Sequence, residues 1–93
     1  MTLHVAHDSI GHRFSVEVDG LLCELVYRLA GSVMTIVHTG VPEQLAGRGI
    51  GAQLMGAALD AARAAGWKVV PACSYATAFM LKHPEFEDLR FHR

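Results

Sequence analysis

The sequence predicts an α+β (mixed α/β) domain with the element order β-β-β-β-α-β-α. Residues 1–40 are dominated by runs in which apolar and polar side chains alternate, as in half-buried strands. Residues 51–65 place apolar side chains at the i, i+3, i+4 spacing of a helix. A short apolar run and a second helical run follow. The first helix is therefore expected to form a right-handed crossover between two parallel strands.

The N-terminal strands are expected to form an antiparallel meander. In the first long run, Phe14, Val16 and Val18 share one face, and polar side chains occupy the other. The Asp19-Gly20 pair that follows is a hairpin signal. The predicted strands are residues 3–7 at the edge, 12–18, 21–29 and 33–41, with a second turn at residues 30–32.

The C-terminal part predicts two helices separated by a strand. The apolar stripe of the first helix consists of Leu54, Met55, Ala58, Leu59 and Ala62, and Gly66 stands where a helix C-cap glycine belongs. The other elements are a strand at residues 67–70, ended by Pro71, and a helix at residues 74–83, with Ser74 as N-cap and Pro84 beyond its end. The secondary structure of residues 85–93 is ambiguous from the sequence.

Length and composition restrict the class of protein. A chain of 93 residues is expected to form a single domain, residues 1–93, and a hydrophobic content of 52% favours a packed core over disorder. The net charge of −1 gives no indication of a nucleic-acid partner or of binding to an anionic membrane. No apolar run has the length of a signal peptide core or a membrane span. Two cysteines, Cys23 and Cys73, fit a reducing compartment, so a cytoplasmic protein is expected.

The histidines give no sign of a metal site, because no Cys/His pair repeats at a ligand interval. On a strand, His4 and His7 would point to opposite faces of the sheet.

A glycine-rich segment, AGRGIG at residues 46–51, precedes the first predicted helix. The N-terminus of a helix carries unpaired N–H groups and a partial positive charge, and glycines let an anion approach them. The segment is therefore either an anion-binding loop, to which Arg48 adds a charge, or a tight turn with a solvated arginine. A Walker A loop is excluded because no Gly-Lys-Ser/Thr occurs. A Rossmann loop is disfavoured, because residues 42–46 separate the loop from its strand and no acidic residue ends the next strand.

The central segment resembles the acyl-CoA-binding core of the GNAT acetyltransferases, and in particular a small single-domain branch known as YjdJ-type, or N-acetyltransferase-domain-containing. The family opens a helix with [RQ]-x-x-G-x-G/A after a strand that ends in a V-P turn. The matching residues here are the HT-x-VP stretch (His38, Thr39, Val41 and Pro42) and the AGRGIG segment, followed by Pro71, Cys73, Ser74 and Tyr75, and by the HPE triplet at residues 83–85. About half of the chain carries the resemblance.

The resemblance implies that acetyl-CoA is the cosubstrate and that an unidentified amine is the acceptor. By this resemblance, the cofactor-binding residues are Val41, Gly47, Arg48, Gly49, Ile50 and Gly51. The pantetheine arm would lie along residues 33–41, where this strand splays from residues 67–70. The chain departs from the family in two ways: Ala46 stands at the [RQ] position, and the two N-terminal helices on the acceptor side are missing. The acceptor side is therefore expected to be open or completed by another chain, and the protein to be a monomer or a weak homodimer.

Three residues are candidates for catalysis. Cys73, close to a helix N-terminus, could be a covalent nucleophile, a general acid or a small residue lining the site. His38 is a candidate base, expected on the strand face of Met34 and Ile36. Tyr75 is suggested by the resemblance, because a tyrosine on this helix protonates the leaving thiolate in many members, usually further along the helix.

Three functions are therefore considered. The first is an acetyl-CoA-dependent N-acetyltransferase. The second is a non-catalytic acyl-CoA-binding or regulatory module, which the missing acceptor-side helices suggest. The third is a structural domain whose glycine loop binds nothing.

Overall fold

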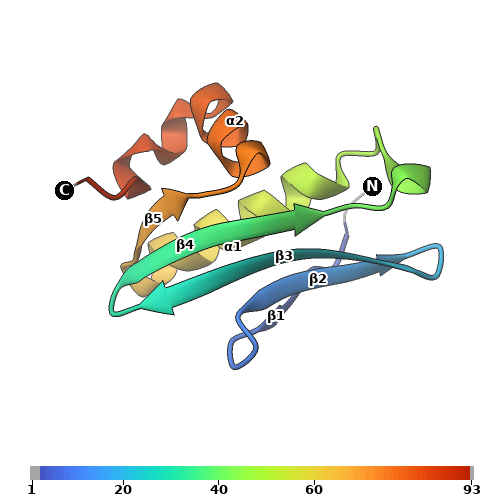
Figure 1. The fold of residues 1–93 in the computed structure, drawn as a ribbon, viewed down its shortest axis with the longest axis horizontal. Helices are drawn as coiled ribbons and strands as arrows, with labels where there is room; N and C mark the ends of the chain where they lie inside the picture. The colour runs from blue at the N-terminus through green and yellow to red at the C-terminus, as the bar shows by residue number, and fades with distance from the viewer. Residues whose placement is uncertain (1–2, 93) are drawn as a thin grey trace.

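The computed structural model describes residues 3–92 and contains one sheet with the strand order β1-β2-β3-β4-β5 (Figure 1). Its elements are β1 (Ala6–Asp8), β2 (Arg13–Val18), β3 (Leu21–Ala30), β4 (Val33–Gly40), the 3-10 helix η1 (Glu43–Leu45), α1 (Ile50–Ala65), β5 (Lys68–Pro71), α2 (Ser74–Lys82) and the 3-10 helix η2 (Pro84–Leu89). Strands β1 to β4 pair antiparallel, and β4 and β5 pair in parallel. The predicted fold class, element order and helical crossover are therefore confirmed.

The β2–β3 hairpin turns at the Asp19-Gly20 pair, as predicted. Asp19 and Gly20 have φ angles of 54° and 76°. Positive φ at both central residues is the signature of a type I′ turn, whose twist matches that of the flanking strands. Because Val18 pairs with Leu21, the turn also fixes the register of the hairpin.

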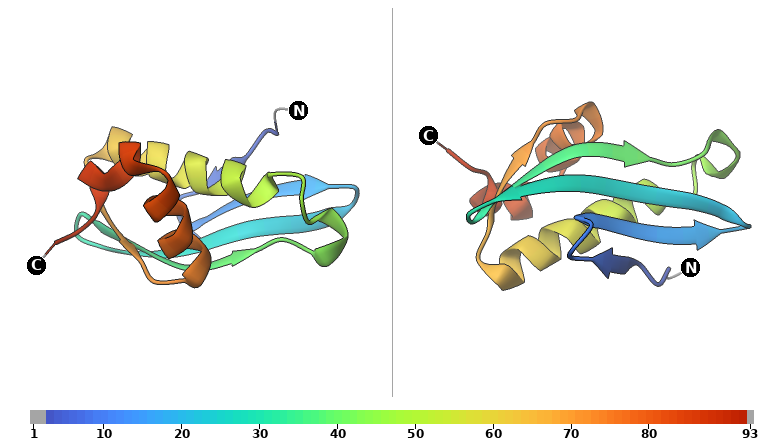
Figure 2. Two further views of the ribbon diagram at one scale, coloured as in Figure 1. Left: turned by 90° about the horizontal axis from the view of Figure 1, so that it is seen from above. Right: turned by 60° about the horizontal axis from the view of Figure 1, so that its bottom comes forward.

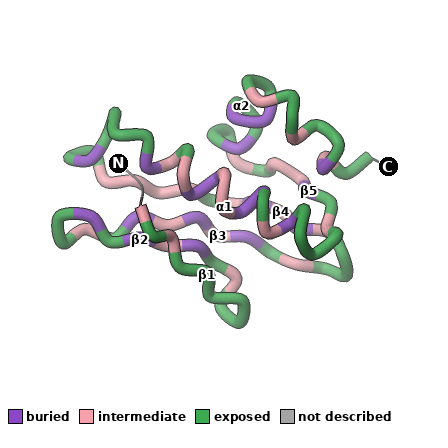
Figure 3. The backbone as a smooth tube through the Cα atoms, turned by 180° about the vertical axis from the view of Figure 1, so that it is seen from behind, coloured by how far each residue is buried: buried purple, intermediate pink, exposed green. Residues whose placement is uncertain are grey.

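Helix α1 lies on one face of the sheet, and α2 packs beside α1 at the β5 edge of the sheet (Figure 2). The strand side chains that face them are buried, together with the apolar stripe of α1, and these positions form one core (Figure 3). The buried residues of α1 are Ile50, Leu54, Met55, Ala58, Leu59 and Ala62, which include the whole predicted stripe. In residues 3–92 no helix covers the opposite face of the sheet, which we call the open face.

Strand β4 contains a bulge at Val37. Its neighbours Ile36 and His38 pair with the consecutive residues Tyr27 and Val26 of β3, so Val37 has no partner of its own. A single extra residue reverses the side-chain alternation of the strand beyond it. Consequently Ile36 faces the helices, whereas His38 faces the opposite side. The expectation that His38 shares a face with Met34 and Ile36 is wrong for this reason.

The helix ends follow local rules, with one correction. Gly66 caps the C-terminus of α1 with a φ of 77°, as predicted. The N-cap of α2 is Cys73, whose thiol accepts a hydrogen bond from the N–H of Ala76 at 3.4 Å, and not Ser74. The ambiguous C-terminal segment forms η2, after which Arg90 bridges to Val69. None of the helices in the described part of the chain is long and apolar enough to cross a membrane.

Candidate active site

Strands β4 and β5 separate at the point where the site begins. Their parallel pairing ends at Ile36 and Pro71. The carbonyl oxygen of Ile36 then accepts hydrogen bonds from the N–H groups of Ala72 at 3.0 Å and Cys73 at 3.1 Å, which turn the chain into α2. Strand β4 continues to Gly40, and no strand within residues 3–92 pairs with it on this side. A free strand edge therefore faces the start of α2.

The glycine loop connects the end of β4 to α1. Gly47 and Gly49 have φ angles of 83° and 75°, and Gly49 is the N-cap of α1 without a side-chain capping bond. The first hydrogen bond of the helix joins the N–H of Gln53 to the carbonyl of Gly49. Within residues 3–92, the N–H groups of residues 47–52 therefore have no acceptor. Amides that lack acceptors at the start of a helix are suited to bind a phosphate or pyrophosphate.

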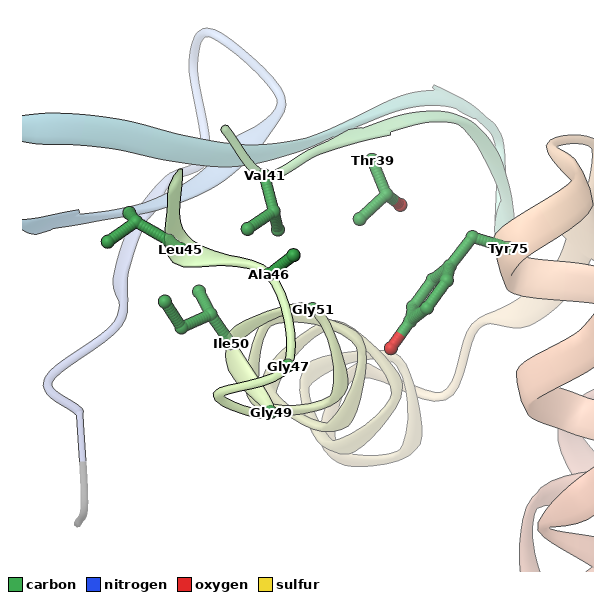
Figure 4. Close-up of a pocket in the computed structure, with 9 residues that line it drawn as sticks. All are labelled: Thr39, Val41, Leu45, Ala46, Gly47, Gly49, Ile50, Gly51 and Tyr75. Carbon is green, nitrogen blue, oxygen red and sulfur yellow. The ribbon is translucent and has the colours of Figure 1, made fainter. Parts of the chain in front are cut away.

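A cavity of about 330 Å³ lies between this loop, β4 and α2 (Figure 4). It is lined by Thr39, Val41, Leu45, Ala46, Gly47, Gly49, Ile50, Gly51 and Tyr75. The cavity thus brings together five of the six residues predicted for the cofactor, namely Val41, Gly47, Gly49, Ile50 and Gly51. Sequence reasoning missed Thr39 and Leu45. Thr39 reaches the cavity only because of the bulge, and Leu45 is a buried residue that anchors the loop in the core.

Arg48, the sixth predicted residue, does not line the cavity. Its guanidinium donates a hydrogen bond of 2.9 Å to the carboxylate of Asp19 in the β2–β3 turn. Both side chains are largely exposed, so the ion pair contributes little to stability. The positive polarity of the cavity therefore comes from the amides of the loop and not from a charged side chain.

Tyr75 reaches from the first turn of α2 across the cavity, with its hydroxyl group directed toward the start of α1 (Figure 4). A Cβ atom added to Gly51 would lie 3.0 Å from Oη and 3.1 Å from Cζ of Tyr75. Glycine at position 51 therefore makes this close approach possible. Partial burial raises the pKa of Tyr75 above the ordinary value of 10.0, so the phenol is neutral at physiological pH and can donate a proton.

Cys73 lies at the start of α2, beside the free edge of β4. Its Sγ atom is 3.8 Å from the hydroxyl oxygen of Thr39, a distance at which a sulfur hydrogen bond is formed. The residue is partly buried and packs against the core. The other thiol, Cys23, is fully buried in β3, and burial raises its pKa. Of the two cysteines, only Cys73 is near the cavity.

His38 lies away from these groups, in a hollow of about 310 Å³ that also contacts Leu22, Glu24, Gly40, Val41 and Pro42. This hollow is on the open face of the sheet, whereas Thr39 and the cavity are on the helical side. The structure therefore brings Tyr75 into the cavity wall and Cys73 next to the wall residue Thr39, but it does not bring His38 to Cys73. Val41 lines both spaces and separates them.

The comparisons with known proteins identify the family. The family model described as "GCN5-related N-acetyl-transferase" matches residues 13–89. The chain belongs to the GCN5-related N-acetyltransferase family. This GNAT domain also resembles the solution structure of a GCN5-like protein from Staphylococcus aureus that is named as a candidate N-acetyltransferase. The TM-score is 0.77 at 28% sequence identity, over 98% of this chain and 90% of the other.

Membership of the family makes the protein an acetyltransferase, and its fold is a minimal form of the GNAT fold. Members of the family generally use acetyl-CoA. The two departures predicted from the sequence are visible in the site: Ala46 lines the cavity where the family has arginine or glutamine, and no helix precedes β2 in the described residues. No group of His, Cys, Asp and Glu side chains in residues 3–92 could hold a metal ion.

Proposed function

We propose that this acetyltransferase binds acetyl-CoA in the cavity of Figure 4 and transfers the acetyl group to an amine. One observation carries the proposal: loop residues with free amides (Gly47, Gly49, Ile50 and Gly51), the unpaired edge of β4 at Thr39, and Tyr75 all border the same cavity. An anionic pyrophosphate suits the amides, and an amide-containing pantetheine arm suits an open strand edge. Residues 1–93 would thus act as one acyl-CoA-binding domain.

The fit of the ligand depends on the glycines. At Gly47 and Gly49 no protein atom lies within 4 Å of the position that a Cβ would take, so this surface of the loop is open to a ligand. Their positive φ angles disfavour any residue with a Cβ. Because Gly47 and Gly49 have no side chain, the loop can adopt this conformation and a ligand can reach its amides.

The chemistry has two routes, which place different demands on Cys73. Acetyl-CoA supplies an acyl group activated as a thioester. In the direct route, the acceptor nitrogen attacks the acyl carbon, the C–S bond to CoA breaks, and the phenol of Tyr75 gives its proton to the leaving thiolate. In the covalent route, the Cys73 thiolate attacks first and forms an acetylated cysteine as CoA leaves, and the amine then takes the acetyl group from Sγ.

The acceptor amine also needs a base that takes its proton. His38 remains a candidate for this step, on the amine and not on Cys73, because its hollow lies across β4 from the cavity. An acceptor bound on the open face would approach β4 from the side of His38. Replacement of His38 by Gln should then lower transfer without changing the affinity for CoA.

The open face also supports a second candidate, a non-catalytic acyl-CoA-binding module. No helix covers the open face in residues 3–92, so the side from which an acceptor would approach is not enclosed. Such a module would bind acetyl-CoA but would not transfer the acetyl group to any amine.

Calorimetric titration with CoA and acetyl-CoA tests the binding of the ligand, which both candidate functions require. Binding is expected for the native chain and not for Gly49→Val, because valine at a φ of 75° would distort the loop. Gly56→Ala, within the helix that Gly49 caps and with nothing within 4 Å of the new Cβ, is the matched control and should bind normally. Lack of binding by the native chain at millimolar ligand would refute both candidates.

Mass spectrometry after incubation with labelled acetyl-CoA separates the routes. An acetyl group on Cys73 that is discharged by an amine supports the covalent route. Turnover by Cys73→Ala supports the direct route. Binding without transfer to a broad panel of amines supports the non-catalytic module.

A further inference from the structure

The hollow on the open face lies beside the part of β4 whose outer edge has no strand partner. It has a volume of about 310 Å³ and is lined by Leu22, Glu24, His38, Gly40, Val41 and Pro42. Within residues 3–92, no strand pairs with β4 beyond Ile36 on the side of β5, so the hollow extends over β3 and β4 up to a free edge. An acceptor bound there could reach across this edge to a thioester in the cavity of Figure 4.

Gly40 leaves the space between Glu24 and the edge of β4 open. Glu24 pairs directly with Gly40, so its side chain stands beside the position that a side chain at Gly40 would take. Neighbouring strands lie about 4.8 Å apart, and glycine places no side chain in this interval. A Cβ at Gly40 would lie 2.8 Å from Nε2 of His38, so the imidazole ring leans over the glycine. The carboxylate and the imidazole therefore border one hollow from neighbouring strands.

The carboxylate of Glu24 can still accept a hydrogen bond from a ligand. Within residues 3–92 it pairs with Arg13, at 3.5 Å between Nη1 and Oε1, and it accepts no hydrogen bond. This distance is longer than that of a charge-assisted hydrogen bond, which is about 2.8 Å. Because β3 lies between β2 and β4, Arg13 meets the carboxylate from the side away from Gly40. The side toward β4 is left for a cation.

Leu22 supplies an apolar surface next to this carboxylate. Its side chain is 56% exposed, and it lines the hollow together with Val41 and Pro42. A short aliphatic chain that covers these side chains would remove apolar area from water. An anionic group beside an apolar wall is suited to a cation at the end of a hydrocarbon chain.

We propose that the hollow on the open face selects the acceptor, and that the preferred acceptor is an aliphatic amine with a second, positively charged nitrogen that binds Glu24. This inference rests on the proposed function, because it names the class of amine that receives the acetyl group. The reacting nitrogen forms a C–N bond to the acyl carbon as the C–S bond breaks, and it gives its proton to the base, for which His38 is the candidate. The second nitrogen keeps its proton and forms no covalent bond. Glu24 is therefore a specificity residue and not a catalytic one.

Three acceptors with the same four-methylene chain test this preference. N,N-dimethylbutane-1,4-diamine and 5-methylhexan-1-amine have the same shape and one primary amine each, but only the diamine carries a second positive charge. The third acceptor, 5-aminopentanoate, ends in a carboxylate. At saturating acetyl-CoA, kcat/KM of the native chain should be about tenfold higher for the diamine than for the monoamine, which is the effect of one hydrogen bond to a charged group. It should be lowest for 5-aminopentanoate. The difference should lie in KM, because Glu24 does not touch the reacting atoms.

Three variants locate the source of the preference. Glu24→Gln should lower kcat/KM for the diamine to that for the monoamine and leave kcat unchanged. Glu17→Gln, which removes an exposed carboxylate from the same face outside the hollow, is the matched control and should keep the preference. Arg13→Gln breaks the ion pair but leaves the carboxylate in place, so it should also keep the preference. Calorimetry should give the same affinity for CoA in all of these chains.

The outcomes distinguish this inference from the function on which it rests. Equal kcat/KM for the diamine and the monoamine, or a preference that survives Glu24→Gln or is lost in Glu17→Gln, would overturn recognition by Glu24 and leave acetyl transfer in place. A higher kcat/KM for 5-aminopentanoate than for the diamine would overturn the predicted charge of the acceptor. If none of the three acceptors is acetylated, this inference fails, and acetyl transfer itself is then decided by the broad panel of amines.

Discussion

At the scale of single residues, Gly51 and Gly56 occupy the same helix but differ in what surrounds them. Gly51→Ala would place a methyl group 3.0 Å from Oη of Tyr75, so the ring would have to shift by a few tenths of an ångström. We expect CoA binding to weaken by up to about tenfold, since the shifted ring would lose part of a wall contact worth about 1.4 kcal/mol. Calorimetry measures the change.

The matched variant Gly56→Ala should behave differently. Its added methyl group meets no atom within 4 Å, and alanine is a better helix former than glycine. The free energy of unfolding should rise by about 0.5–1 kcal/mol, with binding unchanged. If the two variants were indistinguishable in both measurements, the close packing of Tyr75 on α1 would be refuted.

Tyr75→Phe removes only the hydroxyl group. If the phenol protonates the leaving thiolate, kcat should fall by about 100-fold, and the affinity for CoA should change little. Because burial raises the pKa of Tyr75 above 10.0, the contribution of the phenol should persist through neutral pH and be lost only as the pH rises past this raised value. Steady-state rates against pH, for both forms, check this. An unchanged kcat would remove Tyr75 from the chemistry.

The role of a residue could be predicted from the sequence where its immediate neighbours in the chain determine it. It could not be predicted where the role depends on a contact with a residue distant in the sequence. The glycines of the loop and the turn at Asp19 were predictable because their backbone conformations exclude most other residues. Nothing in the sequence pairs Arg48 with Asp19, since they are brought together only when the hairpin folds beside the loop. For Cys73, the rank order of capping residues favoured Ser74, but the turn after Pro71 places the thiol over the first amides of α2.

At the scale of the elements, the pair of Arg63 on α1 and Asp88 on η2 joins the C-terminal segment to the helix. Their closest atoms are 2.6 Å apart, and Arg63 also donates a hydrogen bond to the carbonyl of Glu85 at 3.0 Å. The hydrogen bond from Arg63 holds the pKa of Asp88 below its ordinary value of 3.8. Both groups are exposed, so the contribution to stability is small.

The sign of the pH effect follows from this lowered pKa. A carboxylate whose pKa is lower in the folded state stabilises the fold above its unfolded value and loses that contribution as the pH falls through the folded value. Asp88→Asn should therefore lower the melting temperature slightly at pH 7 and make it less sensitive to acid below pH 4. Thermal unfolding between pH 2 and pH 7 measures both. An acid dependence identical to that of the native chain would contradict the assignment.

The strands and helices themselves were almost fully predictable. The alternation typical of strands and the i, i+3, i+4 spacing of helices identify the elements, and Gly and Pro mark their ends. The bulge at Val37 was not predictable, because residues 33–41 read as one continuous strand that is rich in β-branched residues. A bulge arises from the way in which two strands pair, so the sequence of one strand does not reveal it. The register of the pair depends on the hairpin turn at one end and on packing in the core at the other. The error about His38 follows from this one feature.

At the scale of the whole molecule, a chain of 93 residues has little stability in reserve, so a ligand should change its melting temperature visibly. At a CoA concentration 100 times Kd, the added stability is about 2.7 kcal/mol, which corresponds to a rise of about 10 °C or more in a domain of this size. Thermal unfolding with and without CoA tests this. The Gly49→Val variant should show no rise, and a rise equal to that of the native chain would place the ligand elsewhere.

The bulge at Val37 gives β4 one residue more than regular side-chain alternation needs. Deletion of Val37 would remove the bulge, and Ile36, His38 and Thr39 would then pair in regular register with Tyr27, Val26 and Leu25. Thr39 would still face the helices and His38 the open face, so each side chain would keep its side of the sheet. The deletion would change only the local bend and twist of β4, and it would thus show what the path of the strand contributes beside the glycine loop.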